Sequence, residues 1–379
     1  MSDSSVEHGN IANKRRLAYV VTVVSPAISA MKAIPRTARS LISAHASERR
    51  LPLVTVVLLA LAMLTTSGCA ISPRANEGKT VVIAGASSGF GKGVALALAD
   101  QRANLVLAAR RTQLLEELAR ECERRGAKAV VVTTDVSEED AVRQLADTAI
   151  SRFGGIDVWV NMAGIGAIGR FEEIPLADHH RVIDVNVKGV INGSYYAMQQ
   201  FRKQGSGTLI NIASVAGRVP FPYYPSYVAS KHAVIGLGNT INQELRLNGE
   251  KNIHVSTISP FAADTPWFDH AANYSGHKPR TILPDPPEKV VNAIVTATVR
   301  PKPEINVGYK ANAAVFSHRV ARRMTENMTG TAFHKATIER SPPSEKTAGS
   351  LYEPMQEGQG VDADVRRRLA EGDLKPIER

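Results

Sequence analysis

The sequence contains few cysteines: only Cys69 and Cys122 occur among its 379 residues. Two cysteines do not provide the framework of disulfides that stabilises small secreted domains. No cluster of cysteine and histidine has the spacing of metal ligands, so we expect no metal site. Cys122 shares a helical register with Leu114, Leu118 and Ala119, which predicts a small buried hydrophobic residue on a helix face.

The middle of the chain also lacks an excess of charge. The formal net charge is +10, but residues 1–50 carry 8 Lys and Arg against 3 acidic residues, and residues 300–379 carry 14 against 11. Residues 51–299 then hold 24 basic and 22 acidic residues. A nucleic-acid-binding domain concentrates positive charge on its folded surface. The distribution therefore argues against nucleic acid as a partner.

No charged residue lies between Leu51 and Pro73, where the sequence reads LPLVTVVLLALAMLTTSGC. Arg49 and Arg50 precede this apolar run and small residues precede Cys69, which is the form of a secretory signal. The letters TSGC resemble a bacterial lipobox, in which Cys69 would be acylated. The run is also long enough to be an uncleaved membrane anchor, and a third alternative is a role unrelated to membranes. The first two alternatives both predict membrane association.

Beyond residue 77, β-branched runs alternate with helical patterns. We expect strands over 79–86, 103–109, 127–136, 156–164, 207–214, 252–259 and 304–308. We expect helices over 90–102, 112–125, 138–153, 178–203, 225–247 and 287–299. Strands separated by helices of this length predict an α/β fold with a doubly wound parallel sheet, the Rossmann arrangement.

The chain is therefore expected to hold a single domain over residues 78–310. A basic, disordered leader (1–50) and the hydrophobic segment (51–73) precede this domain. An extension over 311–379 follows it, with a basic helical stretch at 311–328 and a mobile, disordered tail over 340–379. The tail is rich in polar residues, glycine and proline, a composition typical of disorder.

A glycine-rich stretch, GASSGFG, follows the first expected strand directly and opens the next helix. Glycine lets the backbone turn sharply and approach a pyrophosphate, and the helix N-terminus supplies N–H donors. The context therefore predicts a dinucleotide-binding loop. Its residues are Gly85, Ser87, Ser88, Gly89, Phe90 and Gly91.

The segment SVAGRVPFPYYPSYVASK carries a second pattern. Tyr227 and Lys231 are four residues apart and share one face of a helix. Ser214 precedes them at the end of an expected strand, whose carboxyl edge faces the ligand crevice of such folds. With Asn186 in DVNVKG, the four residues resemble the Asn-Ser-Tyr-Lys tetrad of the short-chain dehydrogenase/reductase family. The glycine spacing G-x3-G-x-G resembles the same family, and the resemblance covers residues 80–308.

The resemblance implies an oxidoreductase that interconverts a ketone or aldehyde and an alcohol by hydride transfer. Tyr227 would be the general acid in reduction and the base in oxidation, with its pKa lowered by the ammonium of Lys231 and an oxidised nicotinamide. Lys231 would also bind the nicotinamide ribose. Ser214 would hold the substrate oxygen, and Asn186 would fix a water that returns protons to Tyr227.

The resemblance also implies which further residues contact the cofactor. These are Asp135, Val136, Asn161, Ala163, Gly164, Pro260 and Thr265. Three positions depart from the family pattern: Ala84 replaces a threonine, Met162 replaces an asparagine and Phe261 replaces a glycine. The replacement at Phe261 concerns the loop after the sixth strand, and it puts the geometry with which this loop closes over the cofactor in doubt.

The second expected strand ends in AARR, without a carboxylate. NAD-using enzymes of this fold place an acidic residue near that strand end to bind the ribose hydroxyls. Arg110 there can instead pair with a 2′-phosphate through charge-assisted hydrogen bonds. The sequence therefore favours NADP(H), with NAD(H) as the alternative. A further alternative is that Arg110 and Arg111 only begin a solvated helix.

Aromatic residues gather on both sides of the tetrad. They are Phe221, Tyr223, Tyr224, Phe261, Trp267, Phe268 and Tyr274. They either line an apolar pocket for a bulky carbonyl substrate or pack the loop 261–285 onto the domain. The family resemblance also suggests a homo-oligomer, formed through the helices that carry Asn186 and Tyr227.

A rival to the enzyme is a membrane-tethered protein that binds the dinucleotide, or senses it, without turnover. The complete tetrad favours the enzyme, and the three departures favour the rival. Basic residues before the apolar run place the following domain outside the cytoplasmic membrane, where reduced cofactor is scarce. The sequence leaves the side of the membrane open.

Overall fold

The computed structural model describes residues 72–279 and 283–370, which belong to one compact unit of the chain. The expected leader (1–50) and all but the last two residues of the hydrophobic segment (51–73) lie outside the described residues. Among the helices that are described, none combines the length and apolar character needed to cross a bilayer.

Seven parallel strands form the central sheet, in the order β3-β2-β1-β4-β6-β7-β9. The chain runs outward from β1 to β3 and then crosses back to place β4 against the other side of β1. The doubly wound α/β prediction is confirmed. The strands are β1 (Thr80–Ala84), β2 (Asn104–Ala109), β3 (Lys128–Thr133), β4 (Val158–Asn161), β6 (Gly207–Ile212), β7 (Ile253–Pro260) and β9 (Glu304–Val307).

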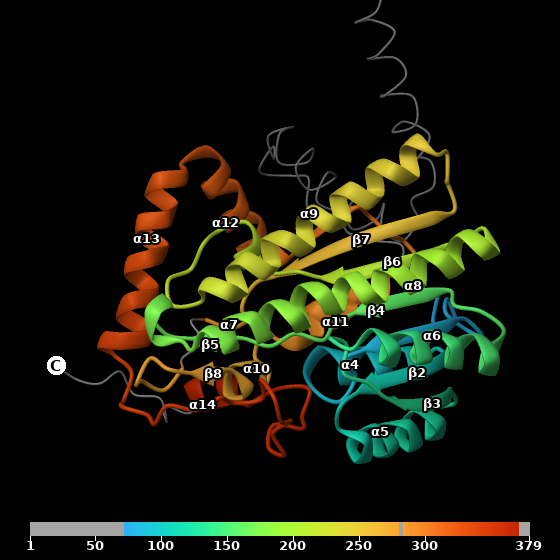
Figure 1. Ribbon diagram of the computed structural model, residues 1–379, viewed down its shortest axis with the longest axis horizontal. Coiled ribbons are helices and arrows are strands. Elements are labelled where there is room, and N and C mark those ends of the chain that lie inside the picture. The colour runs from blue at the N-terminus through green and yellow to red at the C-terminus, as the bar shows by residue number, and fades with distance from the viewer. Residues whose placement is uncertain (1–71, 280–282, 371–379) are drawn as a thin grey trace, which may run out of the picture. The chain divides into compact units, whose positions relative to one another are not determined.

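Helices cover both faces of the sheet (Figure 1). In β1, Val81 and Ile83 pack with the helices of one face, and Val82 and Ala84 pack toward the other. Successive side chains of a strand point to opposite faces, so a strand covered on both sides is apolar throughout. One face carries α4 (Gly89–Ala99), α5 (Thr112–Arg124) and α11 (Pro287–Ala297); the other carries α6 (Glu139–Phe153), α8 (Gly189–Gln204) and α9 (Pro225–Leu247).

Cys122 is buried on α5 beside Leu115, Leu118 and Ala119. The residue that shares its face is thus Leu115 rather than the expected Leu114, which is half-buried. Burial raises the pKa of the Cys122 thiol to about 12. The thiolate is the nucleophile and metal ligand, so Cys122 is an inert packing residue, as its register predicts.

The single helix expected over 178–203 is broken into three parts. They are α7 (Leu176–Ile183), a π-helical turn (Asp184–Lys188) and α8. Asn186 lies in the turn, and its amide side chain pairs with both main-chain groups of Ile165. A π-helical turn inserts one residue into the helical repeat. Hydrophobic periodicity does not reveal this insertion, because the helices on both sides keep their apolar faces.

The region after β7 contains short elements that periodicity did not predict. One is α10 (Trp267–His270), and another is β8 (Ala272–Asn273), which forms a small two-stranded sheet with β5 (Ala167–Ile168) from the segment between β4 and α7. The basic helical stretch expected over 311–328 is two helices followed by a further π-helical turn. They are α12 (Gly308–Val320), α13 (Arg322–His334) and the turn Lys335–Glu339.

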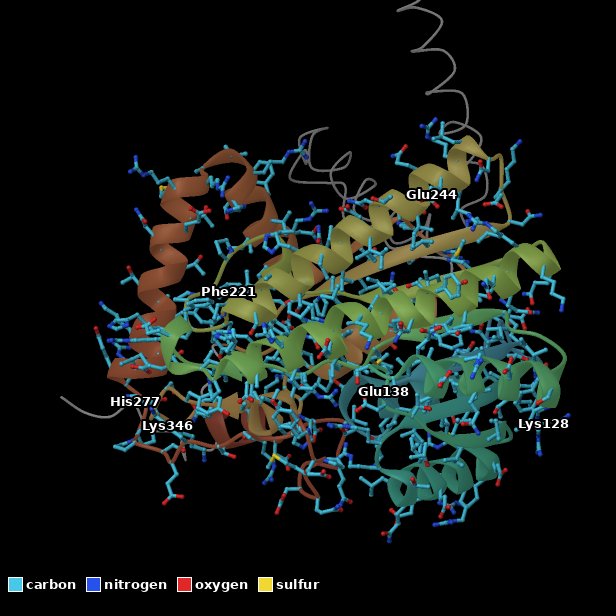
Figure 2. All side chains as sticks on the ribbon, viewed as in Figure 1. Lys128, Glu138, Phe221, Glu244, His277 and Lys346 are labelled. Atoms are coloured by element: carbon cyan, nitrogen blue, oxygen red, sulfur yellow. The ribbon has the colours of Figure 1, made fainter. Side chains whose placement is uncertain are left out.

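The expectation of a mobile tail over 340–379 is wrong for its described part, 340–370. Asn273 bridges to Thr347 and His277 bridges to Pro343, so the chain returns to the domain after α13. Figure 2 shows His277 and Lys346 at the same end of the molecule. Leu351 is fully buried in the core cluster that includes α6 and α8. The chain then passes to α14 (Val365–Ala370).

Two glycines of α9 offer a matched pair for testing how tightly this helix packs on the sheet. A Cβ on Gly238 would lie 2.1 Å from Thr257 Oγ1, whereas a Cβ on Gly236 would meet nothing within 4 Å. We predict that Gly238→Ala lowers the free energy of unfolding by about 1–3 kcal/mol through overpacking. Gly236→Ala should raise it by about 0.5–1 kcal/mol through helix propensity. Urea denaturation measures both, and a shift of the same sign in the two variants would contradict the packing.

Candidate active site

The glycine loop between β1 and α4 lies close to the end of β4. A Cβ on Gly85 would lie 2.6 Å from the Ala163 nitrogen, and one on Gly91 would lie 2.0 Å from the Gly85 oxygen. Any side chain at either position would push the loop away. Gly89 has a φ of 54°, in the left-handed region that favours glycine. The loop is thus shaped as a close backbone cradle at the N-terminus of α4, which fits a pyrophosphate.

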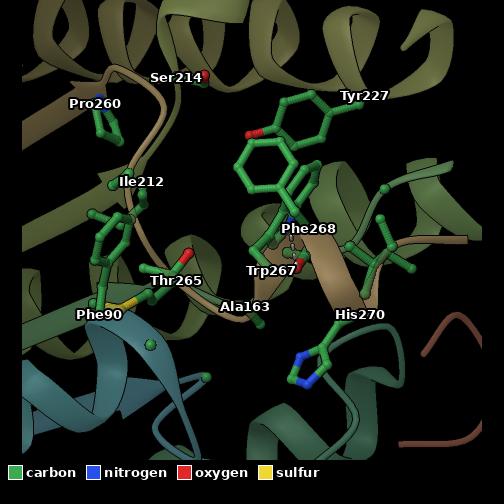
Figure 3. Close-up of a pocket in the computed structure, with 18 of the residues that line it drawn as sticks. Phe90, Ala163, Ile212, Ser214, Tyr227, Pro260, Thr265, Trp267, Phe268 and His270 are labelled. Atoms are coloured by element: carbon green, nitrogen blue, oxygen red, sulfur yellow. Dashed lines mark hydrogen bonds between the residues drawn. The ribbon is translucent and has the colours of Figure 1, made fainter. Parts of the chain in front are cut away.

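A cavity of about 470 Å³ runs along the carboxyl ends of the strands. Arg110 and Asp135 line it, and so do the glycine loop and Tyr227. Figure 3 shows Thr265 and Phe90 within it, opposite Tyr227 and Trp267. Every residue predicted to contact the cofactor lines this cavity except Asn161. The cradle and the elongated cavity together fit a dinucleotide.

Asn161 is instead part of the sheet. Its buried side chain accepts a hydrogen bond from Trp159 Nε1 at 2.8 Å and donates one to Asn211 Oδ1 at 2.9 Å. The structure therefore corrects the prediction for this residue, because its amide ties β4 to β6 rather than facing the cavity. The family pattern places an asparagine here, but a pattern does not tell on which side of the strand end its amide lies.

Three of the four predicted catalytic residues line the cavity: Ser214, Tyr227 and Lys231. Ser214 follows β6, and its Oγ accepts a hydrogen bond from Ala216 N at 3.1 Å. Pro225 begins α9 and is suited to the first turn of a helix, where its missing N–H costs nothing. Tyr227 therefore lies in that first turn, and the Lys231 ammonium is 5.5 Å from the centre of its ring.

Burial controls the protonation of this pair. It raises the pKa of Tyr227 to about 12, although the hydroxyl of Ser214 acts in the opposite direction. It also lowers the pKa of Lys231 to about 8. The Lys231 ammonium donates a hydrogen bond to the Ile212 carbonyl at 2.8 Å. Without a cofactor the net pKa of Tyr227 is raised, so its phenol is protonated at neutral pH. The acidification of the phenol beside an oxidised nicotinamide stays a prediction.

Asn186 is fully buried and does not line the cavity. Its Oδ1 accepts from Ile165 N at 2.9 Å, and its Nδ2 donates to the Ile165 oxygen at 2.9 Å and to Ser230 Oγ at 3.0 Å. These bonds hold Ile165, which follows Gly164 in the cavity wall. Gly164 lies beside both Asn186 and Lys231, since a Cβ on it would be 3.5 Å from Asn186 Oδ1 and from Lys231 Nζ. The water-holding role of Asn186 stays a prediction.

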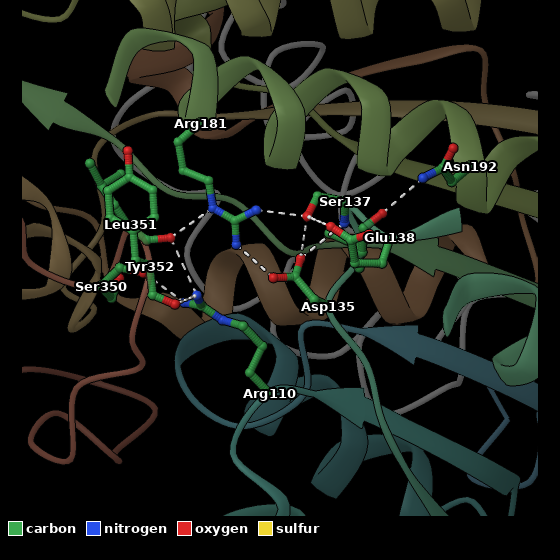
Figure 4. Close-up of polar contacts among 10 residues, drawn as sticks. Arg110, Asp135, Ser137, Glu138, Arg181, Asn192, Ser350, Leu351 and Tyr352 are labelled. Carbon is green, nitrogen blue, oxygen red and sulfur yellow. Dashed lines mark hydrogen bonds and ion pairs between the residues drawn. The ribbon is translucent and has the colours of Figure 1, made fainter. Parts of the chain in front are cut away.

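Two arginines that the sequence analysis did not assign organise the far end of the cavity. Arg111 donates to Ser87 Oγ at 3.0 Å and to Ser88 Oγ at 2.7 Å, which holds the glycine loop. Arg181 pairs with Asp135 at 2.6 Å (Figure 4). Burial raises the pKa of Asp135, but hydrogen bonds from Arg181 and Ser137 outweigh it, and the net pKa is lowered. Asp135 is therefore a fixed carboxylate.

The departures from the family pattern do not strain the backbone. Among the described residues, the non-glycine positions with positive φ are Arg102, Tyr223, Leu283 and Asp364. Neither Met162 nor Phe261 belongs to this set, so neither needs a conformation that only glycine adopts easily. Both side chains line the cavity.

Aromatic side chains close the end of the cavity near Tyr227. Of the seven that the sequence suggested, Tyr223 and Tyr274 do not line it; they hydrogen-bond to His334 and Asp178. The lining ones are Phe221, Tyr224, Phe261, Trp267 and Phe268. Phe333 of α13 joins them and stacks on Phe221 with ring centroids 4.5 Å apart. The sequence did not predict Phe333, because α13 lies outside the expected domain.

The described residues contain no group of three or more His, Cys, Asp or Glu side chains arranged to hold a metal ion. The charged and titratable side chains that line the cavity are those of Arg110, Arg111, Asp135, Tyr224, Tyr227, Lys231 and His270.

Comparison with known proteins agrees with this geometry. The sequence model described as short chain dehydrogenase matches residues 79–274. The chain belongs to this family. It is 33% identical over 280 residues to the uncharacterized oxidoreductase YxnA of Bacillus subtilis, a match that covers 73% of this chain and 78% of YxnA. As a member of the family, the protein is an oxidoreductase that acts on CH–OH groups with NAD(P).

Two solved structures of the family resemble the fold. A short-chain dehydrogenase/reductase from Burkholderia phymatum in complex with NAD matches with a TM-score of 0.59 and 28% identity, covering 66% of this chain and 96% of that one. An alcohol dehydrogenase from Thermococcus sibiricus complexed with 5-hydroxy-NADP matches with a TM-score of 0.52 and 27% identity, covering 60% and 95%.

The buried lysine gives a test of the site's electrostatics. Its folded pKa of about 8 is below the ordinary 10.5, so the buried ammonium destabilises the protein below pH 8. This penalty disappears as the pH rises from about 8 to about 10.5. Lys231→Met should therefore have a higher free energy of unfolding than the wild type at pH 7, by up to ~3 kcal/mol, and so a higher unfolding temperature. It should lose this advantage by pH 10.5.

Thermal unfolding at the two pH values measures the effect. The exposed Lys203, on α8, provides a matched Lys→Met control that should show no advantage at either pH. An equal gain for Lys231→Met at both pH values would contradict a charge penalty.

Proposed function

We propose that the protein reduces the carbonyl group of a bulky, apolar substrate with NADPH, with Tyr227 as the general acid. One observation carries this proposal. Tyr227 lines a cavity that is continuous with the glycine loop and is closed by aromatic side chains beside the tyrosine. The same cavity can therefore hold a dinucleotide and an apolar substrate next to a proton donor.

The bound dinucleotide would supply the hydride to the carbonyl carbon. Tyr227 transfers its phenolic proton to the carbonyl oxygen, and solvent returns a proton to the phenolate. Because the pKa of Tyr227 is raised to about 12, the phenol carries this proton at neutral pH. Ser214 accepts a hydrogen bond from Ala216 N, and its hydroxyl also acts on the phenol of Tyr227. A substrate oxygen placed beside the phenol would then receive the O–H of Ser214 as charge develops there.

The charge at the far end of the cavity supports NADP(H) over NAD(H). Arg110 and Arg111 are partly buried and hydrogen-bond only to hydroxyl and carbonyl oxygens in the described part of the chain. No carboxylate there lies within ion-pair distance of either one. Two neighbouring guanidinium groups without an ion-pair partner favour the additional negative charge of a 2′-phosphate.

The size and composition of the other end support a bulky apolar substrate. Trp267 lies 4.8 Å from the Tyr227 ring, between ring centroids, and Phe268 packs against Trp267. Phe221 and Phe333 extend the apolar wall toward α13. Aromatic walls with few polar groups bind ligands of the same character. Sugars would leave their hydroxyls without partners here.

Substitution of the proposed acid tests the reaction. NADPH oxidation with a panel of aromatic and alicyclic ketones should fall by about 10²–10⁴-fold in Tyr227→Phe, the usual contribution of a general acid. Tyr224→Phe is the matched control, because Tyr224 is a tyrosine that lines the same cavity three residues earlier. It should keep most of the activity.

The same assay examines the cofactor, and kcat/KM should be at least ~10-fold higher with NADPH than with NADH if the paired arginines bind a 2′-phosphate. Wild-type protein that binds NADPH but transfers no hydride to any ketone of the panel would favour the binding protein without turnover.

We also propose that the protein associates with membranes. The hydrophobic segment 51–73 motivates this proposal, and α12 and α13 support it. Phe316 and Val320 on α12 are 68% and 69% exposed, and Met324 and Met328 on α13 are 59% and 65% exposed. Each pair is four residues apart and shares a helix face. Arg319, Arg322 and Arg323 lie among them. Apolar side chains flanked by cations suit an anionic bilayer surface.

Vesicle flotation of the full chain tests this surface. We expect flotation with vesicles of phosphatidylserine and phosphatidylcholine, and a reduced fraction, by about 3-fold or more, for Phe316→Ser/Met324→Ser. Leu176→Ser is the control, because Leu176 is a 68% exposed apolar residue of α7, outside this surface and outside α8 and α9. Unchanged flotation of the double variant would exclude this surface, and its conversion from dimer to monomer would assign the surface to a second copy of the chain.

We further propose that the protein forms a homo-oligomer. Ile191 and Tyr195 on α8 and Leu247 on α9 are exposed apolar residues of the two helices expected to form it. Light scattering of the full chain would measure the assembly.

A further inference from the structure

The C-terminal segment 350–366, which we term the strap, runs beside the cavity from Arg110 past the glycine loop to Asp264. At one end, Arg110 donates to the carbonyl oxygens of Ser350 at 2.7 Å and Tyr352 at 2.7 Å. Figure 4 shows these bonds beside Arg181, which donates to the Leu351 carbonyl at 2.9 Å. The strap therefore begins at the end of the site where the sequence places a 2′-phosphate.

The strap then passes over the glycine loop. Arg111 donates to the Met355 carbonyl at 3.1 Å, and Gly89 N donates to the Gly360 carbonyl at 2.9 Å. At the C-terminal end of the strap, the carboxylate of Asp264 accepts hydrogen bonds from three main-chain N–H groups. They belong to Ala363, Val365 and Arg366, at 3.2, 3.1 and 2.8 Å. Asp264 precedes Thr265, so the strap ends beside the nicotinamide half of the expected site.

The sequence is built for this close approach. Gly358 has a φ of 65°, and a Cβ there would lie 2.5 Å from His270 Nε2. Gly349, just before the strap, has a φ of 51°, and its Cβ would lie 2.4 Å from the His270 oxygen. Both positions require glycine for conformation and for space. The fully buried Leu351 anchors the segment between them.

The strap lines one part of the cavity and leaves the interior open. Ser350, Pro354 and Met355 are its residues that line the cavity, whose total volume is about 470 Å³. Arg110 donates its hydrogen bonds to neutral carbonyl oxygens of the strap. These oxygens orient the guanidinium group without neutralising its charge. The bonds use three of the five N–H groups of Arg110. The charge and the remaining N–H groups stay available to a ligand below.

We propose that the strap is a wall of the dinucleotide site: it positions Arg110 and Arg111 for the cofactor phosphate and retards cofactor exchange. The strap closes over the bound dinucleotide and opens to release it. This inference rests on the proposed NADP(H) function. It assigns a binding role to a segment that lies outside the family match at 79–274.

The rate of NADPH dissociation tests the proposal. Energy transfer from the tryptophans to bound NADPH can be followed by stopped flow in the full chain, because Trp267 lines the cavity. Leu351→Ala removes the buried anchor and Gly358→Ala pushes the strap from His270. We expect each variant to release NADPH at least ~10-fold faster and to lose part of its preference for NADPH over NADH. Lys346→Ala is the control, because Lys346 is exposed and lies four residues before the strap.

Each outcome decides the question. Gly358→Ala leaves the core intact, so it reports on the strap even if Leu351→Ala fails to fold. Wild-type dissociation rates in a folded Gly358→Ala would overturn the proposal. Slower release and tighter binding in that variant would also overturn it, because the strap would then compete with the cofactor. A wild type that binds neither NADPH nor NADH would instead refute the proposed function itself.

Discussion

The close approach of β1 and β4 at their carboxyl ends is the constraint on which the site depends. Gly85 touches the backbone at Ala163, and no side chain fits between them. This contact is where the winding of the sheet reverses, and it leaves a crevice above the strand ends. Parallel strands end at one edge, so Arg110 after β2, Asp135 after β3 and Ser214 after β6 reach the same cavity.

The site opposes stability at its centre. Lys231 is almost completely buried and carries a charge that the interior disfavours, as its lowered pKa shows. The chain offsets part of this cost with one strong contact, the bond from Lys231 Nζ to the Ile212 carbonyl. Asn186 supports the same wall through Ile165. Buried polar groups that are held by such bonds stay in one arrangement, which suits a site that must keep its geometry.

The sequence predicted those features that follow from local pattern. Buried parallel strands are apolar on both faces, so the alternation of strands and helices gave the sheet, and the spacing of Tyr227 and Lys231 placed both on one side of α9. It failed where contacts join distant segments. Arg181 reaches Asp135 across 46 residues, and Arg110 meets the strap more than 200 residues later. Composition suggested a disordered tail, because the polar strap contributes little apolar area besides Leu351.

The strap is held mainly by its own carbonyl and N–H groups, through Arg110, Arg111 and Asp264. Main-chain groups are present whatever the side chain is, so most of its residues are free to drift during evolution. Residue type is constrained at Gly358 and Gly360, where a Cβ would clash, and at the buried Leu351, as it is at Gly349 just before the strap. Sequence identity in this segment would then decay quickly among relatives that share it, and a common ancestry of such segments would be recognised by their path over the sheet rather than by their letters.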